Sequence, residues 1–398
     1  MHATAVLQKL LRRSIPSIHL KRLNSLVALV GSALSGRRLT LSALGRSLPG
    51  SSAVRYRVKR ADRLLGNTRL HEEQLLFYRL LCDLLIGTRP EPILIVDWSD
   101  LRWDRSWQLL RASVWVHGFA LPIYEEVHPL RLQNNRSVQR EFLLTLRMLL
   151  PDGVRPIVVT DAGFRGPWFK EVEHLNWHWV GRIRGHTLVQ LDGRWRHCFR
   201  LFGQATGRPT DLGPQAFAHA QPVAGRLVLY RKPARGRHDI NRYGRLARSF
   251  ISRKNARRER EPWLIAASLS LCDKTALDLV NLYRVRTRIE HSFRTLKSHQ
   301  FGFAFEDTQS RKPERMAVLL LIQALALFLA WIAGWAAQRT GLRGKLTSHG
   351  ERRGNTLSVV TLGCLALSLL QLPLSARDFA ATLRSPLAPP PLNSGERK

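Results

Sequence analysis

Apolar positions in the first 85 residues recur at helical spacing. In "LTLSALGRSLPGSSAVRYRVKRADRLLGN" this period stops at Pro49-Gly50 and resumes in a strongly basic run. A helix, a turn and a basic helix are the outline of a helix-turn-helix-like DNA reader, although a helical hairpin with a solvated basic helix has the same pattern. We therefore expect a helical DNA-binding domain over residues 1–85. Its candidate DNA contacts are Arg55, Arg57, Lys59 and Arg60.

From Glu91 the pattern changes to short, continuous apolar runs. "PILIVDWSDL" has such a run up to Asp97, and "RPIVVTDAGF" repeats the design with Asp161. Between them, "LLRASVWVHG" and "ALPIYEEVHPL" read as strands, and Arg136–Leu150 reads as an amphipathic helix stopped by Pro151. Strands interspersed with helices predict a mixed α/β sheet.

The second half of the chain alternates between basic and apolar segments. Residues 186–262 are Gly-rich, basic and alternating, which predicts a β-rich insertion carrying a mobile basic loop near its end. A basic helix over 281–303, a long apolar helix and a smaller helical region follow. "SPLAPPPLNSGERK" at the end is a Pro-rich tail that we expect to be disordered.

Met316–Ala337 is apolar over a length that could span a bilayer, and only Gln323 is polar within it. The alternative is a helix buried in a protein core. A single span here would divide a strongly basic chain across a membrane, so we favour the buried helix. The N-terminus lacks a long apolar core followed by a small-residue cleavage site, so we expect no signal peptide.

Charge narrows the class of partner. The chain has 63 Lys and Arg against 29 Asp and Glu, a net charge of +34. Such an excess indicates a polyanionic partner; we favour DNA, with an anionic membrane or structural RNA as alternatives. Four cysteines without C-x-x-C spacing argue against a disulfide framework or a zinc site and fit a reducing cytoplasm.

Two acids follow the apolar runs. Asp97 and Asp161 each stand where a buried strand is expected to end, and adjacent strand ends of an open α/β sheet form a ligand-binding rim. A single Asp after an apolar run often only begins a turn, but the repeated design makes this pair a candidate site.

A third acid lies in the basic helix. At about 100° per residue, Tyr283, Arg286, Glu290 and Lys297 fall within about 60° of one another on one helix face. An exposed face of i,i+4 charge pairs would explain Arg286 and Glu290 but not the other two.

Three carboxylates brought together from two strands and a helix would repel one another without a cation between them. Hard oxygen ligands favour Mg²⁺ or Mn²⁺. Two such ions about 3.5–4 Å apart would activate a water or a 3′-hydroxyl for attack on a phosphodiester. The cationic residues near Glu290 would then hold the adjacent DNA phosphates.

The spacing Tyr283-x2-Arg286-x3-Glu290-x6-Lys297 matches the signature of bacterial DDE transposases of the insertion-sequence-four family, which this chain resembles over about residues 20–385. "VDWSDL", "TDAGFRGPWF" and "IEHSFRTLKS" look most similar to the insertion-sequence-ten-like members. The resemblance implies that Asp97, Asp161 and Glu290 are the catalytic metal ligands.

The resemblance also implies an architecture. It predicts an RNase H-like catalytic core over residues 86–340, interrupted by a β-rich insertion at about 186–265. Helical N-terminal and C-terminal domains, residues 1–85 and 341–398, would flank this core.

The implied activity is cut-and-paste transposition. One strand is nicked at the element end, the freed 3′-hydroxyl attacks the other strand to form a hairpin, and the reopened ends join target DNA. The implied partners are double-stranded DNA, at terminal inverted repeats and target sites, and a second copy of the chain in an end-paired homodimer. No membrane is implied, and the location would be the bacterial cytoplasm, at the nucleoid.

Further contacts follow from the resemblance. Tyr283, Arg286 and Lys297 would contact terminal phosphates, and Trp263 would stack on a base flipped from the hairpin, unless it is a core tryptophan. Apart from the resemblance, Arg182 and Arg184 in "GRIRG" alternate on an expected strand after the second acid, and they could line the DNA path or form a surface salt-bridged pair.

Three other functions stay open. An RNase H-like nuclease would cut DNA without strand transfer, and a transposase relic would bind DNA without cutting it. The presence of all three acids argues against the relic. A membrane protein built on the apolar helix is the third.

Overall fold

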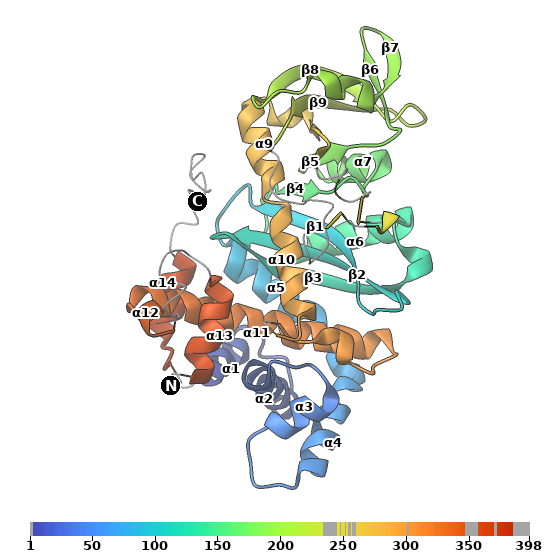
Figure 1. Ribbon diagram of the computed structural model, residues 1–398. Coiled ribbons are helices and arrows are strands. Elements are labelled where there is room, and N and C mark those ends of the chain that lie inside the picture. The colour runs from blue at the N-terminus through green and yellow to red at the C-terminus, as the bar shows by residue number, and fades with distance from the viewer. Residues whose placement is uncertain are drawn as a thin grey trace. The chain divides into compact units, whose positions relative to one another are not determined.

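The structure is a computed structural model that divides into two compact units (Figure 1). Unit 1 comprises residues 1–133, 144–154 and 287–398, and unit 2 comprises residues 134–143 and 155–286. The structure describes residues 3–233, 245–246, 248–250, 252–253, 256, 260–300, 302–346, 357–369 and 372–384. Most of the predicted basic loop and the Pro-rich tail lie outside the described residues.

Helices form the N-terminal part of unit 1, as the apolar spacing predicts. Side chains cap two of them: Thr40 Oγ1 accepts from the backbone N–H of Ala43, and Asn67 Oδ1 accepts from that of Leu70. The five helices are α1 (Ala3–Ser14), α2 (Leu20–Gly36), α3 (Leu41–Ser47), α4 (Val54–Leu65) and α5 (Thr68–Ile86).

Helices α3 and α4 form the expected pair joined by a turn. They approach so closely that a Cβ on Gly45 would lie 2.5–2.6 Å from the side chain and Cα of Val58. Only glycine allows this contact, so the small residue in α3 sets the distance between the two helices.

Three antiparallel strands complete the N-terminal half of unit 1 in the order β3-β2-β1. They are β1 (Ile93–Asp100), β2 (Trp107–Val116) and β3 (Phe119–Pro129), which confirms these strand predictions. The turn between β2 and β3 has positive φ at both His117 and Gly118, 43° and 81°, as a tight two-residue hairpin requires.

Helix α11 (Pro313–Arg339) is the central helix of unit 1 and packs against α2, α13 and β3. It is the one helix among the described residues that is long and apolar enough to cross a membrane, and 94% of its most apolar window is buried inside the protein. Gly334 of α11 and Gly363 of α13 lie against the partner helix's backbone, where a side chain would collide. This burial supports the core-helix interpretation.

The remaining helices of unit 1 include α10, which packs against β3 and β1 (Figure 1). They are α10 (Thr287–Lys297), α12 (Arg343–Leu346), α13 (Val359–Leu369) and α14 (Ala376–Arg384). Short 3₁₀ turns lie at Leu130–Leu132 and Phe305–Asp307.

Unit 2 is built on a sheet in the order β4-β5-β10-β9-β8-β6-β7, in which β4 and β5 are parallel. The strands between 186 and 265 confirm the β-rich character predicted for that segment. The strands are β4 (Ile157–Thr160), β5 (His178–Ile183), β6 (Leu188–Leu191), β7 (Arg194–His197), β8 (Thr210–Phe217), β9 (Val223–Tyr230) and β10 (Trp263–Ala267). Its helices among the described residues include α7 (Gly166–His174) and α9 (Ala276–Arg284), with 3₁₀ turns at Cys198–Gln204 and Leu269–Leu271.

Helix α6 (Arg136–Leu149) begins among residues of unit 2 and ends among residues of unit 1. It starts at the predicted residue, Arg136, and ends one residue before the predicted Leu150. The chain as a whole is a mixed α/β protein.

The single helix predicted over 281–303 is wrong. Helix α9 ends at Arg284 and α10 begins at Thr287, with the N–H of Arg286 bonded to the carbonyl of Tyr283 in a tight turn. β-branched residues alternate here at Val285, Thr287 and Ile289, and their restricted side chains weaken a helix. The four signature residues therefore do not share one helix face.

Candidate active site

Asp97 lies inside β1, after the fully buried run Leu94–Val96. Its Oδ1 accepts a hydrogen bond from the backbone N–H of Trp98 at 2.8 Å. The strand does not end at Asp97, as the sequence suggested, because pairing with β2 continues to Asp100. Asp97 is partly buried and lies opposite Arg111 in the β1–β2 register.

Asp161 directly follows β4, so the predicted strand end is confirmed here. Its Oδ1 accepts from the N–H of Gly163 at 2.7 Å, which holds the start of the loop leading to α7. Asp161 belongs to unit 2, whereas Asp97 and Glu290 belong to unit 1.

Glu290 is an exposed residue in the first turn of α10. The buried side of α10 is formed by Ile289, Ser292, Phe293 and Leu296. Seven residues make almost two full helical turns, so Lys297 lies on the same edge of α10 as Glu290.

Lys297 is partly buried among charged groups. Burial lowers the pKa of Lys297, and Glu306 and Asp100 offset part of that effect, whereas Arg111 adds to it. Its ammonium lies 3.8 Å from the Glu306 carboxylate. Asp100 is the last residue of β1, so Lys297 lies near the end of this strand.

The oxygen donors of unit 1 fit a hard divalent ion. Asp97 and Glu290 are carboxylates on a strand and a helix that pack together, and Mg²⁺ typically binds through one or two carboxylates plus substrate phosphate. Among the residues that the structure describes, no cluster of three or more His, Cys, Asp or Glu side chains is placed to hold a metal ion. The three-acid site remains a prediction.

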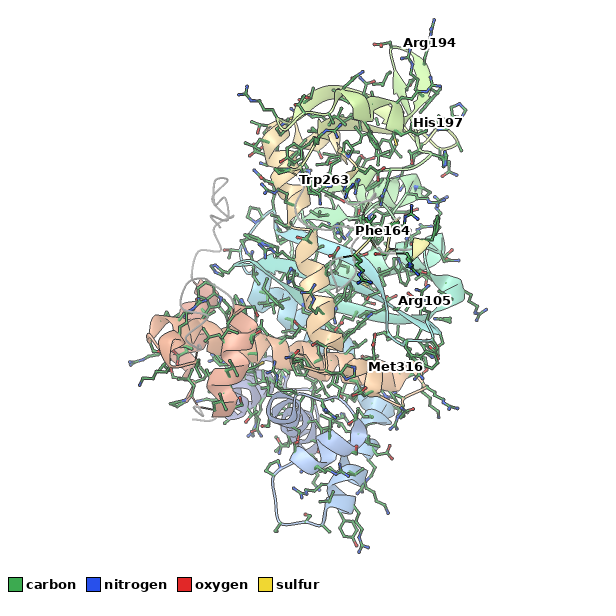
Figure 2. All side chains as sticks on the ribbon, in the orientation of Figure 1. Arg105, Phe164, Arg194, His197, Trp263 and Met316 are labelled. Carbon is green, nitrogen blue, oxygen red and sulfur yellow. The ribbon has the colours of Figure 1, made fainter. Side chains whose placement is uncertain are left out.

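Tyr283 and Trp263 pack together in unit 2. Figure 2 labels Trp263 among the side chains of this unit. Their ring centroids are 5.0 Å apart in an edge-to-face arrangement, and the Tyr230 ring also lies 6.0 Å from that of Trp263. Both residues are buried, and the ammonium of Lys232 lies 5.5 Å from the Trp263 centroid. Trp263 therefore packs as a core tryptophan, the alternative that the sequence left open. Its stacking on a flipped base remains a prediction.

Arg182 and Arg184 form the salt-bridged pair that the sequence left open. Both guanidinium groups contact the carboxylate of Glu261, at 3.4 Å for Arg182, and Arg182 also donates to the carbonyls of Glu261 and Pro262. Burial lowers the pKa of Arg182, and Tyr283 raises it in part. The charge of Arg286 also lowers the pKa of Arg182. Tyr283 and Arg286, two residues of the signature, therefore lie near the Arg182–Arg184 pair.

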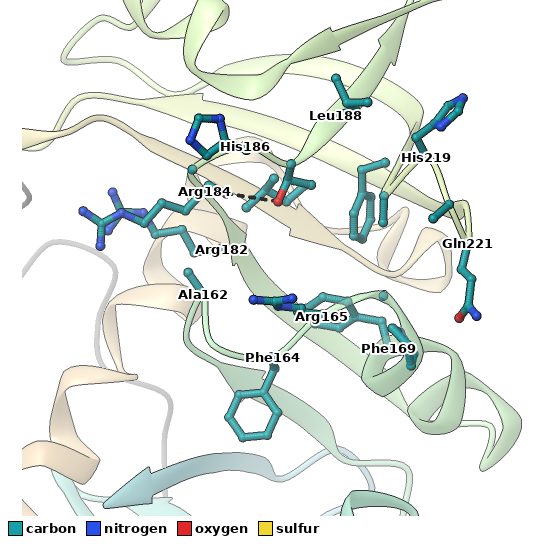
Figure 3. A pocket seen from close by; sticks show the side chains of 18 residues that line it. Ala162, Phe164, Arg165, Phe169, Arg182, Arg184, His186, Leu188, His219 and Gln221 are labelled. Carbon is teal, nitrogen blue, oxygen red and sulfur yellow. Dashed lines mark hydrogen bonds between the residues drawn. The ribbon is translucent and has the colours of Figure 1, made fainter. Parts of the chain in front are cut away.

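A cavity of about 920 Å³ lies within unit 2 (Figure 3). Arg182, Arg184 and Arg165 line it, together with the apolar rings of Phe164 and Phe169. Ala162, the residue directly after Asp161, also lines the cavity. The structure thus brings Arg182 of β5 and Arg184, directly after β5, to a cavity that also borders the loop following Asp161.

The predicted DNA contacts of α4 divide into two groups. Arg57 and Arg60 line a hollow of about 530 Å³, although Arg57 also donates to the carbonyl of Leu48 at 2.5 Å. Arg55 and Lys59 are exposed on the same helix, with Arg55 stacked on the ring of Tyr56.

Arg63, which belongs to the predicted basic run of α4, also lines the hollow. Two further basic residues come from α2 and were not predicted: Lys21, and Arg22, which is paired with Glu73 at 2.5 Å. The basic pair Lys21-Arg22 at the start of α2 was the available signal. Arg111, a buried cation in the middle of β2, was not predicted either.

The sequence profile of the family described as "Transposase DDE domain" matches residues 88–329, more than half of the 398 residues. None of the curated proteins compared with the chain matches it. The matched segment contains Asp97, Asp161 and Glu290. The chain therefore belongs to the transposase DDE domain family.

Proposed function

We propose that this transposase moves a DNA element by cutting and pasting. One strand is nicked at the element end, its 3′-hydroxyl attacks the opposite strand to form a hairpin, and the reopened 3′ ends join target DNA. The observation that carries the proposal is the family match over residues 88–329, which spans all three acids. The signature spacing supports a place in the insertion-sequence-four family near its insertion-sequence-ten-like members, with an RNase H-like core.

The proposed metal ligands are Asp97, Asp161 and Glu290. Two bound Mg²⁺ ions would supply the positive charge that activates the attacking oxygen and stabilises the departing one. The protein residues orient the DNA. The exposed position of Glu290 and the packing of α10 on β1 support a role for this carboxylate at the surface where DNA binds.

The proposed DNA contacts are cationic groups near these acids. Lys297 shares the helix edge of Glu290, while Tyr283 and Arg286 lie with Arg182 in unit 2. The hollow beside α4 would hold the duplex of the terminal repeat through Lys21, Arg57, Arg60 and Arg63. Two chains would pair two element ends.

The experiment that tests this proposal uses, as its substrate, the DNA that flanks the coding sequence. The purified chain is incubated with labelled end DNA in Mg²⁺ or in EDTA, beside Glu290→Gln and a control, Glu314→Gln. Glu314 is also exposed, in the first turn of α11. Hairpin-ended products from wild type and Glu314→Gln, absent with EDTA or Glu290→Gln, would support the proposal.

Two other outcomes would favour the competing functions. Metal-dependent nicks without hairpins or joined products would favour a nuclease. Binding of end DNA without any cleavage, in wild type and variants alike, would identify a DNA-binding relic and refute the catalytic roles.

The stacking role of Trp263 has its own test. Trp263→Phe keeps an aromatic ring against Tyr283 but offers a smaller face to a flipped base. We expect nicking at the wild-type rate and slower hairpin formation. Equal slowing of both steps would show that Trp263 only maintains the core.

A further inference from the structure

Arg111 is a fully buried cation in the middle of β2. A charge without solvent is costly unless it is paired and its donors are satisfied. Glu125 on β3, also with a fully buried side chain, supplies the pairing: its Oε1 accepts from Arg111 Nε at 2.8 Å and lies 2.6 Å from Nη2. The hydroxyl of Tyr78 donates to Glu125 Oε2 at 3.2 Å.

The remaining donors of Arg111 reach two helices. Nη1 donates to Ser292 Oγ on α10 at 2.9 Å, and Nη2 donates to Gln323 Oε1 on α11 at 3.2 Å. The guanidinium carbon lies 5.0 Å from the centre of the Phe293 ring, also on α10. One side chain therefore contacts a strand and two helices in fixed directions.

The sheet register places this contact beside an acid of the candidate site. Asp97, Arg111 and Glu125 are direct neighbours across β1, β2 and β3. Directly opposed residues in adjacent strands point to the same face of a sheet. Ser292 is two residues after Glu290, so the hydrogen bond from Arg111 holds α10 next to that acid.

We infer that Arg111 and Ser292 are positioning residues that hold α10, and with it Glu290, in place against the strand of Asp97. This inference rests on the proposed role of the two acids as metal ligands. Ligand side chains need to be held within about 0.5 Å of their working geometry, and a directional hydrogen bond fixes a helix along its axis more closely than apolar packing does.

General stability does not account for this arrangement. Apolar side chains of similar volume often replace a buried ion pair without loss of stability. The Arg111 side chain instead links β2, which pairs with the strand of Asp97, to α10, the helix that carries Glu290. The two acids belong to the same compact unit, so the hydrogen bond acts within one body.

Ser292→Ala tests the inference because it removes one hydroxyl and leaves the Arg111–Glu125 pair. The matched control is Ser113→Ala, which removes another fully buried hydroxyl from β2; among the described residues, the Ser113 Oγ has no hydrogen-bond partner. Ser292→Thr keeps the hydroxyl and should restore function. If Ser292→Ala unfolds below the assay temperature, Ser292→Cys is compared with Ser113→Ala in its place.

The direct measurement is binding of Mn²⁺ to the full chain with uncleavable end DNA, followed by electron paramagnetic resonance. We expect Ser292→Ala to bind end DNA like wild type, yet to need about tenfold more Mn²⁺ for half-saturation. Its cleavage should be about 10–100-fold slower at low Mg²⁺, the usual size of effects from residues that support metal ligands.

Ser292→Ala and Ser113→Ala with the same Mn²⁺ affinity and cleavage rate would overturn the inference. Failure of the proposed function looks different. Wild type would then bind Mn²⁺ and DNA without cleaving, and the Mn²⁺ titration of the two serine variants would still show whether α10 is positioned by this bond.

Discussion

Gln323 accepts a hydrogen bond from Arg111 Nη2 at 3.2 Å, and both side chains are fully buried. Gln323 is the polar residue in the apolar stretch Met316–Ala337, so this bond explains its presence. In a bilayer-spanning helix the same amide would face hydrocarbon. Here it satisfies a cation in the core, which agrees with the burial of α11.

Replacing Gln323 with leucine should therefore destabilise the fold. Gln323→Leu leaves a buried N–H of Arg111 without its acceptor, which typically costs about 1–3 kcal/mol. Urea unfolding followed by circular dichroism measures the loss. Gln338→Leu, near the C-terminal end of the same helix, is the control and should have little effect. An unchanged free energy of unfolding in Gln323→Leu would show that the bond does not contribute.

Gly45→Ala should separate α3 from α4. The added Cβ would lie 2.5–2.6 Å from Val58, and such overpacking typically costs about 1–3 kcal/mol. We expect a lower melting temperature and weaker binding of end DNA, because the α4 hollow changes shape. Gly344→Ala is the control, since nothing lies within 4 Å of its Cβ position. Wild-type binding by Gly45→Ala would contradict a role for this helix pair in DNA recognition.

Arg60→Ala should weaken DNA binding through lost phosphate contact. Arg60 is exposed and lines the hollow beside α4. Removal of one phosphate contact lowers the slope of log affinity against log salt by about 1, equally for specific and random DNA. Arg69→Ala removes an exposed arginine that is paired with Glu72 and is absent from the lining of the hollow. Equal salt slopes for Arg60→Ala and wild type would place the DNA elsewhere.

His117 should make stability depend on pH. Burial lowers the pKa of His117 from its ordinary 6.5, and Arg89 lowers it further. The unfolded chain therefore binds more protons at this site, so the contribution of His117 is present above about pH 6.5 and is lost as the pH falls. The His117 ring packs against Trp335 at 4.8 Å.

Thermal melts between pH 7.5 and 5.5 check this expectation. The melting temperature of His117→Gln should fall less with acid than that of wild type. His219→Gln, at an exposed position in unit 2, should retain the wild-type pH dependence. Parallel curves for wild type and His117→Gln would assign the acid sensitivity to other groups.

Local sequence patterns were sufficient for much of the fold, and they singled out the three acids whose role stays a prediction. Short apolar runs identified β2 and β3, and amphipathic spacing identified the start of α6, because those signals lie within a few neighbouring residues. The run before Asp161 marked a strand end correctly. The spacing around Glu290 indicated the transposase family, and the profile match then established membership of the DDE domain family.

Contacts between residues far apart in the sequence determined the remaining features of the fold and of the candidate site. The strand containing Asp97 continues because β2 pairs with it, and the helix around Glu290 is broken although a helical projection assumes it is continuous. The hydrogen-bond partners of Arg111 lie 14, 181 and 212 positions away in the chain. No local period connects such residues, since only burial of a charge between a sheet and two helices brings them together.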